Sequence, residues 1–289
     1  MGIEQDGIKM DAENAPESAP LNARRKRRFS RIPMRIVIPN LVTLLALSLG
    51  LTSIRFAAEG KFEMSAVFIV CAAVLDGLDG RLARALDGAS RFGAELDSLA
   101  DFVDFGVAPA FLLYFWSLHE APSLGWFAAM IFAIAAALRL ARFNVMIDDP
   151  NKPAWHAQFF VGMPAPAGAI CAMLPIYLKY SVVGMPEGRI FTFIEIAYVI
   201  AVAFLMVSRI PHFSGKQIGR VPRDYFIPVL FAVAAFVLLL ATFPMEVLVA
   251  LTLVYLGILP LAVRRHQALT LADEAAAGAL APAETLAKG

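Results

Sequence analysis

The 289-residue chain is 59% hydrophobic and only 17% charged, and its mean hydropathy is +0.68. Soluble domains are nearer half apolar and a quarter charged, so this composition argues against a soluble protein and predicts one embedded in a membrane. The formal net charge is +1 and no nucleic-acid-binding motif is evident, so a nucleic-acid partner is not expected.

Residues 1–34 differ in composition from the rest of the chain. They are polar and acidic at first and end in a basic run from Arg24 to Arg28, followed by Arg31. This pattern predicts a disordered cytoplasmic tail whose basic end meets anionic lipid headgroups. The apolar run from Ile36 to Ala58 is long enough to span a bilayer and no clean cleavage site follows it, which argues against a secretory signal; a twin-arginine export signal is a weaker alternative.

The remaining chain predicts an all-α, polytopic transmembrane helix bundle. About twenty apolar residues cross a bilayer core. Pro164, Pro166 and Pro175 interrupt the fifth candidate span and Pro260 the eighth, so these two are among the least well defined. The eight candidate spans are 37–58, 62–86, 92–117, 124–146, 164–182, 191–209, 225–243 and 246–263.

The basic residues predict how this bundle is oriented. Eight spans place both ends of the chain on one side of the membrane. Of the 25 lysines and arginines, this topology leaves only four on the far side, namely Arg55, Lys61, Lys179 and Arg189. Because cytoplasmic loops carry the excess of lysine and arginine, both termini are expected in the cytoplasm. For a bacterial chain, the membrane is the inner membrane.

An acidic cluster interrupts the apolar pattern of the second and third spans. Asp76 and Asp79 lie near the end of the second span, and Asp97, Asp101 and Asp104 lie near the start of the third. A charged side chain at the centre of a span costs about 2.5–3.5 kcal/mol on insertion scales. Several unpaired carboxylates together would therefore cost on the order of 10 kcal/mol, so the cluster requires a cation.

Helix geometry predicts that four of these acids converge. Asp76 and Asp79 fall within an arc of about 100° of the second span, and Asp97 and Asp101 are four residues apart on the third. The short 87–91 connection makes the two helices antiparallel neighbours. Oxygen ligands without histidine or cysteine suit Mg²⁺ or Mn²⁺ rather than zinc, and four carboxylates can hold two ions. Asp104 continues the stripe and is interpreted as a lining residue of the cavity or a partner of the ligands.

Small residues on the same faces have two interpretations. Gly80, Ala83 and Gly93 indicate either close helix–helix packing or room for a nucleotide to approach the backbone. Arg84 lies one turn beyond Gly80, where its guanidinium can hold a phosphate oxygen. Beside a metal site, the nucleotide interpretation is favoured.

These residues together form a signature that resembles the CDP-alcohol phosphatidyltransferase family. The signature covers residues 76–101 without a departure at its fixed positions, and a weaker resemblance extends from Pro39 and Asn40 to about residue 175. The matching positions read Asp76-x2-Asp79-Gly80-x2-Ala83-Arg84-x8-Gly93-x3-Asp97-x3-Asp101.

The resemblance implies a six-helix membrane core, commonly dimeric, with a polar cavity that faces the cytoplasm. In this chain the core would cover 35–223, two additional helices would cover 224–265, and 266–289 would form a cytoplasmic tail. By analogy, the four signature aspartates hold two divalent metals that bind the CDP-lipid diphosphate, and Asp101 is also the general base. Gly80, Ala83, Arg84 and Gly93 would line the CDP pocket.

Residues outside the signature resemble the branch of the family that uses serine as the acceptor. This resemblance lies in segments 97–110, 138–144 and 160–166. It implies that CDP-diacylglycerol and L-serine are the substrates and CMP a product, in phospholipid biosynthesis. Arg139 and Arg142 are candidates to bind the serine carboxylate or the lipid phosphate, with ordinary anchoring at the membrane surface as the alternative. Asn144 and Asn40 are weaker candidates for the same cavity.

Several alternatives stay open from the sequence. A sister enzyme could use glycerol 3-phosphate, inositol phosphate or choline as the acceptor. A cation-coupled transporter could use the carboxylates as an ion path, and a catalytically silent scaffold is a third possibility, which the complete signature disfavours. The four histidines, His119, His156, His212 and His266, lie in predicted loops or tails and are expected at the exposed surface.

Overall fold

The computed structural model describes residues 34–88, 90–147, 159–184, 186, 188–213 and 225–286. The predicted 1–34 tail therefore lies outside the described residues except for Met34, and so does His156. For residues 271–286 the helix is described but the side chains are not.

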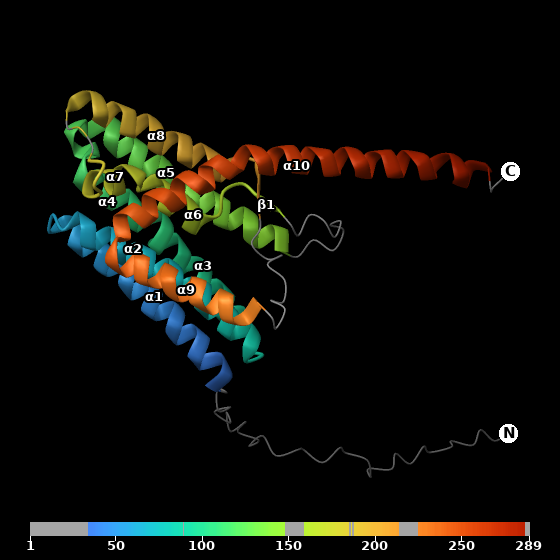
Figure 1. Cartoon of the computed structure of the whole chain (residues 1–289), viewed down its shortest axis with the longest axis horizontal. Helices are drawn as coiled ribbons and strands as arrows, with labels where there is room; N and C mark the ends of the chain where they lie inside the picture. Colours follow the sequence, from blue (N-terminus) through green and yellow to red (C-terminus); the bar gives the residue numbers. More distant parts are fainter. Residues whose placement is uncertain are drawn as a thin grey trace, which may run out of the picture. The chain divides into compact units, whose positions relative to one another are not determined.

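The first two helices form an antiparallel hairpin (Figure 1). α1 (Met34–Ala58) and α2 (Phe62–Ala85) are joined by a short turn, and Ser53 and Ser65 donate hydrogen bonds across the buried interface, with a hydroxyl–hydroxyl distance of 2.8 Å. In the turn, Glu59 pairs with Lys61 at 2.7 Å and with Arg55 at 2.8 Å. The hydrogen bond from Lys61, followed by that from Arg55, lowers the pKa of the exposed Glu59 carboxyl.

The third predicted span is one continuous helical rod with a π-helical segment inside it. α3 (Arg91–Phe102) leads into η1 (Val103–Val107) and then into α4 (Ala108–Trp116). Ser90 caps the start of α3, where its side-chain oxygen accepts a hydrogen bond from the Gly93 amide at 3.0 Å. The inserted π turn redirects the side chains that follow Asp101, and such turns occur frequently at functional sites.

The middle of the chain supplies the rest of the bundle. A short turn, η2 (Leu118–Glu120), leads into α5 (Pro122–Ile147), which packs against α8 (Arg189–Val207). The fifth predicted span is broken into α6 (Ala165–Ala172) and α7 (Leu174–Tyr180), with Pro175 in the first turn of α7. Two short strands, β1 (Phe159–Val161) and β2 (Pro211–Phe213), pair antiparallel and are the one addition to the all-α expectation within the described residues.

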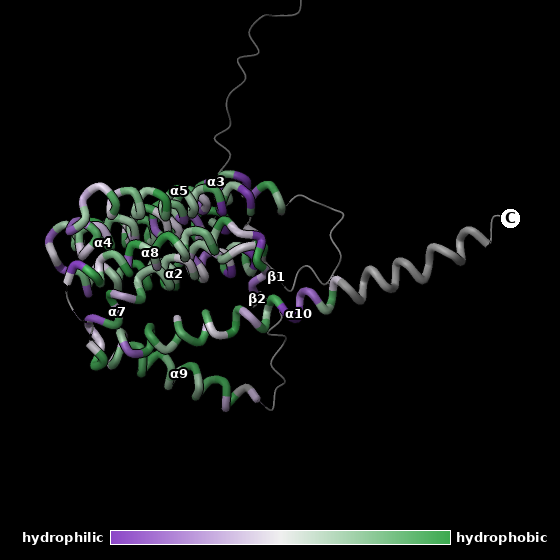
Figure 2. The backbone as a smooth tube through the Cα atoms, turned by 90° about the horizontal axis from the view of Figure 1, so that it is seen from above, coloured by the Kyte–Doolittle hydropathy of each residue, from purple (hydrophilic) through white to green (hydrophobic). Residues whose placement is uncertain are grey.

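The last two helices lie beside the earlier bundle (Figure 2). α9 (Phe226–Thr242) is apolar and exposed along almost its whole length. α10 (Pro244–Leu286) packs on α7 and β2 and then extends away from the bundle. Its helix continues through the residues that the sequence assigns to the C-terminal tail, up to Leu286.

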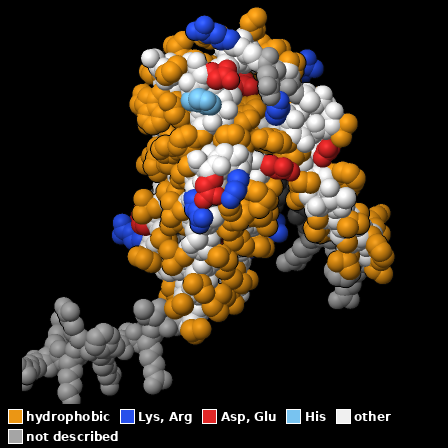
Figure 3. All heavy atoms as spheres, turned by 90° about the vertical axis from the view of Figure 1, so that its left-hand side faces the viewer, with side chains coloured by type: hydrophobic (Ala, Val, Ile, Leu, Met, Phe, Trp, Pro, Cys, Tyr) orange, Lys and Arg blue, Asp and Glu red, His pale blue; other side chains and the backbone are white. Residues whose placement is uncertain are grey.

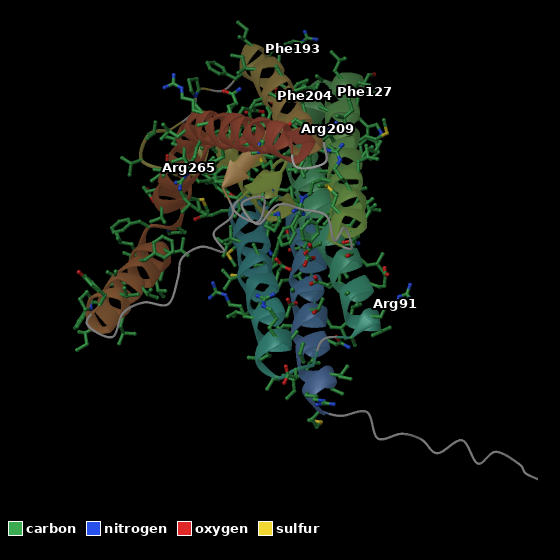
Figure 4. All side chains as sticks on the ribbon, turned by 90° about the vertical axis from the view of Figure 1, so that its right-hand side faces the viewer. Arg91, Phe127, Phe193, Phe204, Arg209 and Arg265 are labelled. Atoms are coloured by element: carbon green, nitrogen blue, oxygen red, sulfur yellow. The ribbon has the colours of Figure 1, made fainter. Side chains whose placement is uncertain are left out.

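The surface has the character expected of a helical membrane protein. Five helical segments within the described residues are long and apolar enough to cross a membrane: Met34–Ala58, Arg91–Trp116, Pro122–Met146, Arg189–Val207 and Pro244–Thr270. α2 has the length but carries Asp76 and Asp79, and α9 is shorter. Hydrophobic side chains cover most of the face in Figure 3, with charged groups in small clusters. Figure 4 shows Phe127, Phe193 and Phe204 pointing outward from α5 and α8. The predicted polytopic helix bundle is confirmed.

Candidate active site between α1, α2 and α3

Three of the four signature aspartates lie together between α2 and α3. Asp76 comes from α2, and Asp97 and Asp101 come from successive turns of α3. One carboxylate oxygen of each lies within 4.8 Å of the others, and all three side chains are partly buried. A set of carboxylate oxygens at this spacing fits a hard divalent cation such as Mg²⁺ or Mn²⁺.

Asp79 lies one turn along α2 and is held by the first helix. Its side chain is almost fully buried, and Oδ2 accepts a hydrogen bond of 2.7 Å from the Thr43 hydroxyl of α1. From the sequence, all four acids are expected to converge at one depth. In the structure three of them meet within 4.8 Å, and Asp79 lies beside them, in electrostatic contact with Asp76 and Asp97, and lines the adjoining cavity with Asp97.

That cavity has a volume of about 210 Å³ and opens between α1, α2 and the start of α3. All four residues expected to bind CDP line it. Its complete lining is Pro39, Asn40, Thr43, Asp79, Gly80, Ala83, Arg84, Gly88, Ser90, Gly93, Ala94 and Asp97. The group of three aspartates and the cavity are therefore contiguous, because Asp97 belongs to both.

Two glycines keep the cavity open. A Cβ added to Gly93 would lie 2.7 Å from Oδ1 of Asn40 and 3.1 Å from the Ser90 hydroxyl. A Cβ added to Gly80 would protrude into space that only the Arg84 guanidinium approaches, at 3.7 Å. Asn40 was grouped with the acceptor candidates from the sequence, whereas the structure places it next to Gly93 in the lining of this cavity.

Some lining residues were not singled out from the sequence. A Cβ on Gly88 would lie 1.9 Å from the Arg35 carbonyl oxygen, so this glycine lets the start of α1 pack on the α2–α3 turn. Thr43 carries a weak sequence signal, since it lies three residues after Asn40 and shares its helix face. Ser90 carries a local sequence signal, because serine is a preferred residue just before a helix.

Asp104 lies deeper, in the π-helical segment η1. Its side chain is 1% exposed and its Oδ1 atom has no hydrogen-bond partner among the described residues. A Cβ on Gly50 of α1 would lie only 2.0 Å from this oxygen, so the absence of a side chain at Gly50 makes room for the carboxyl group. Asp104 belongs to the same acidic region but not to the group of three.

The two arginines of α5 that are candidates to bind the serine carboxylate or the lipid phosphate differ in their contacts. Arg139 is buried, lies over the Phe143 ring at 5.1 Å, and interacts electrostatically with Asp101 and Asp76. Arg142 instead donates hydrogen bonds to the carbonyl oxygens of Val207 at 2.6 Å and Ser208 at 3.3 Å, which ties α5 to the end of α8.

Asn144, one turn further along α5, is exposed and donates a hydrogen bond of 2.9 Å to the Ser98 hydroxyl. Ser98 lies on α3, so this bond joins α5 to the helix that carries Asp97 and Asp101. Of the candidates on α5, only Arg139 combines burial with electrostatic contact to the acids.

The histidines do not all lie at the surface as expected. His119 is exposed and His266 is partly exposed, but His212 in β2 is 2% exposed. Burial lowers the pKa of His212 despite the neighbouring Ile210 carbonyl, whose hydrogen bond acts in the opposite direction. The expectation failed here because the 209–213 segment pairs with β1 and is covered by α10, contacts that join segments far apart in the sequence.

Comparison with known proteins identifies the family. A family model described as CDP-alcohol phosphatidyltransferase matches residues 36–259. A Mycobacterium leprae protein named CDP-diacylglycerol–serine O-phosphatidyltransferase is 40% identical, over 83% of this chain and 78% of its own. Proteins of the same name from Mycobacterium tuberculosis H37Rv and Helicobacter pylori 26695 are 38% and 36% identical, over 80% and 63% of this chain and 79% and 74% of theirs.

The matched residues run from the start of α1 into α10 and contain the group of three aspartates and the whole lining of the adjoining cavity. The chain therefore belongs to the CDP-alcohol phosphatidyltransferase family.

Proposed function

We propose that this chain is an integral membrane phosphatidylserine synthase. It transfers the phosphatidyl group of CDP-diacylglycerol to the hydroxyl of L-serine and releases CMP, as a step of phospholipid biosynthesis. The observation that carries this proposal is the group of Asp76, Asp97 and Asp101 beside a glycine-lined cavity. The relatives that match across most of their own length carry the name of this activity.

The nucleotide part of the substrate would lie in the 210 Å³ cavity. Gly80, Ala83 and Gly93 leave the walls free of bulky side chains, so the cytidine can approach the helix backbone. The Arg84 guanidinium would donate to a phosphate oxygen, and Asn40 offers a further polar group in the lining of the same cavity. The diphosphate would then lie towards Asp79 and Asp97, which line the same cavity.

The carboxylates of Asp76, Asp79, Asp97 and Asp101 are proposed to hold two divalent cations. The donor set fits this role, because three carboxylates provide oxygens within 4.8 Å of one another and Asp79 is buried beside them. Bound Mg²⁺ or Mn²⁺ would neutralise the diphosphate and the charge that develops on the departing CMP. Thr43 fixes the Asp79 carboxylate through its hydrogen bond.

Asp101 is proposed as the general base. The serine hydroxyl oxygen forms a bond to the phosphorus next to diacylglycerol, the bond from that phosphorus to the CMP oxygen breaks, and CMP leaves with the bonding electrons. The hydroxyl proton passes to an Asp101 carboxylate oxygen, because an alcohol is a poor nucleophile at neutral pH. Among the arginines of α5, Arg139 would bind an anionic substrate group, while Arg142 and Asn144 hold α5 against α8 and α3.

The proposed setting is the bacterial inner membrane, with both termini and the cavity on the cytoplasmic side. The charge asymmetry supports this orientation, since few basic residues lie on the far side. We further propose a homodimer, with residues 35–223 as the enzymatic core and 224–265 as additional helices between the two tails.

The test is CMP release by the purified protein from CDP-diacylglycerol, with and without L-serine and divalent metal. Asp101→Asn is expected to keep the fold and the binding of CDP-lipid and to lose about 10²–10⁴-fold in turnover. Glu95→Gln is the matched control, because Glu95 is an exposed acid on the same helix.

Near-normal turnover of Asp101→Asn would remove the assigned base. CMP release that depends on glycerol 3-phosphate, inositol phosphate or choline instead of serine would replace the acceptor. Solute flux in sealed vesicles without any CMP release would favour the transporter alternative.

A further inference from the structure

The last long helix brings two buried hydroxyl groups that have no partner within the described part of the chain. Thr252 of α10 is 1% exposed and its Oγ1 makes no hydrogen bond. Tyr255 lies three residues later, on the same face of the helix, and its hydroxyl is also buried and unpartnered. Buried hydroxyls are nearly always hydrogen-bonded, so two on one helix face indicate a missing partner.

A buried cation lies within electrostatic range of this face. Tyr255 and the Arg139 guanidinium of α5 interact electrostatically, and Arg139 interacts in the same way with Asp101 and Asp76. Arg139 is 8% exposed and, among the described residues, makes neither an ion pair nor a hydrogen bond, although it lies over the Phe143 ring. Asp101 and Asp76 supply negative charge nearby but accept no hydrogen bond from Arg139, so its five N–H donors can bind the anionic oxygens of a ligand.

The Tyr255 ring is oriented by the strand β2. The His212 ring lies nearly parallel to it, with 6.0 Å between centroids and 21° between planes. The Nδ1 atom of His212 lies 2.9 Å from the Ile210 carbonyl, which can only accept, so Nδ1 carries the hydrogen and the imidazole is fixed. His212 and Tyr255 also line a cavity of about 140 Å³, together with Ile258 and Leu259. His212 is therefore a positioning residue for Tyr255.

We propose that Tyr255 and Thr252 of α10, together with Arg139 of α5, bind one anionic group of a substrate next to Asp101. Each of the three can donate hydrogen bonds, and the guanidinium supplies the positive charge, so an oxyanion fits and a metal cation does not. The inference rests on the proposed function, which offers two sources of such a group: the carboxylate of the amino-acid acceptor and the phosphate of the CDP-lipid. The proposed site also gives α10, which lies outside the signature helices, a role in substrate binding.

The experiment compares full-length Tyr255→Phe and Thr252→Val with the parent protein in lipid nanodiscs. Steady-state CMP release gives the KM of L-serine and of CDP-diacylglycerol separately. Loss of one hydrogen bond to a charged group is expected to raise one of these KM values about tenfold to a hundredfold, with a smaller change in kcat. Tyr225→Phe is the matched control, because Tyr225 is an exposed tyrosine just before α9.

The two KM values show which substrate supplies the anionic group. A rise confined to the KM of serine, together with weaker discrimination against serinamide, assigns the carboxylate. A rise confined to the KM of CDP-diacylglycerol assigns the phosphate. Thermal stabilisation of each variant by serine or by CDP-diacylglycerol provides a readout that does not depend on turnover.

Unchanged KM values and unchanged stabilisation by both substrates, in variants that elute and melt as the parent protein does, would overturn the inference. This outcome leaves the proposed function intact. If the parent protein itself releases no CMP in the presence of serine, the proposed function fails first, and the stabilisation measurements alone then decide whether Tyr255 contacts an anionic ligand.

Discussion

Replacing Thr43 by valine removes a hydroxyl from the first helix while nearly preserving the shape of the side chain. The hydroxyl donates a 2.7 Å hydrogen bond to Oδ2 of Asp79, and both side chains are almost fully buried, at 5% and 3% exposure. A hydrogen bond to a charged group contributes about 1.5–3 kcal/mol. Because 1.4 kcal/mol corresponds to a factor of ten, we expect the variant to bind divalent metal about ten- to a hundredfold more weakly.

This range agrees with the general effect of removing a group that orients a metal ligand, which is about ten- to a hundredfold in metal affinity or activity. The assay is CMP release at fixed CDP-diacylglycerol and serine over a series of Mg²⁺ or Mn²⁺ concentrations. The expected result is a shift of the half-maximal metal concentration to higher values, with recovery of most of the rate at saturating metal.

Thr52→Val is the matched control on the same helix. The Thr52 hydroxyl donates to the Ser48 carbonyl of its own helix, at 2.6 Å, and does not line the cavity. If Thr43→Val and Thr52→Val gave the same metal dependence as the parent protein, Asp79 would not need Thr43 to hold a metal, and the assignment of Asp79 as a ligand would lose its structural support.

Two further outcomes are expected. Gly93→Ala should raise the KM of CDP-diacylglycerol without lowering the melting temperature, because alanine favours the helix while its Cβ would lie 2.7 Å from Oδ1 of Asn40. Gly77→Ala is the control and should change neither quantity, because a Cβ added there meets nothing within 4 Å. Equal kinetics in both variants would contradict a nucleotide at Gly93. The buried His212 has a lowered pKa, so the unfolded chain binds a proton more readily than the folded one. Stability should therefore be fully present above the unfolded pKa of histidine, about 6.5, and should decrease as the pH falls below it. His212→Phe should flatten the loss of melting temperature between pH 7.5 and pH 5.5, and a parent protein that melts at the same temperature at both values would refute this.

The regular elements and the acidic signature could be predicted because they depend on local patterns. Each of the eight predicted spans corresponds to helix in the structure, since an apolar run of the right length has no other way to satisfy its backbone in a membrane. The break inside the fifth span also follows from its prolines, which interrupt backbone hydrogen bonding. The spacing of Asp97 and Asp101 on one helix is a local property too, so their proximity could be expected.

Contacts between distant segments could not be predicted in this way. Thr43 and Asp79 are 36 residues apart, and only the register of α1 against α2 brings the hydroxyl to the carboxylate. Arg142 and Arg139 look equivalent in the sequence, but the end of α8 supplies carbonyl oxygens to Arg142 and none to Arg139.

By itself, the sequence determined the membrane class, the helices, and the acidic and small residues that lie together at the candidate site. Periodicity, hydropathy and spacing act within one helix or between neighbours joined by a short turn, and these residues all lie there. The tertiary structure alone decided that His212 is buried, that Asp79 accepts a hydrogen bond from Thr43, and that Tyr255 of α10 interacts electrostatically with Arg139. These features arise from how helices distant in the chain pack, which depends on the shape of both surfaces at once.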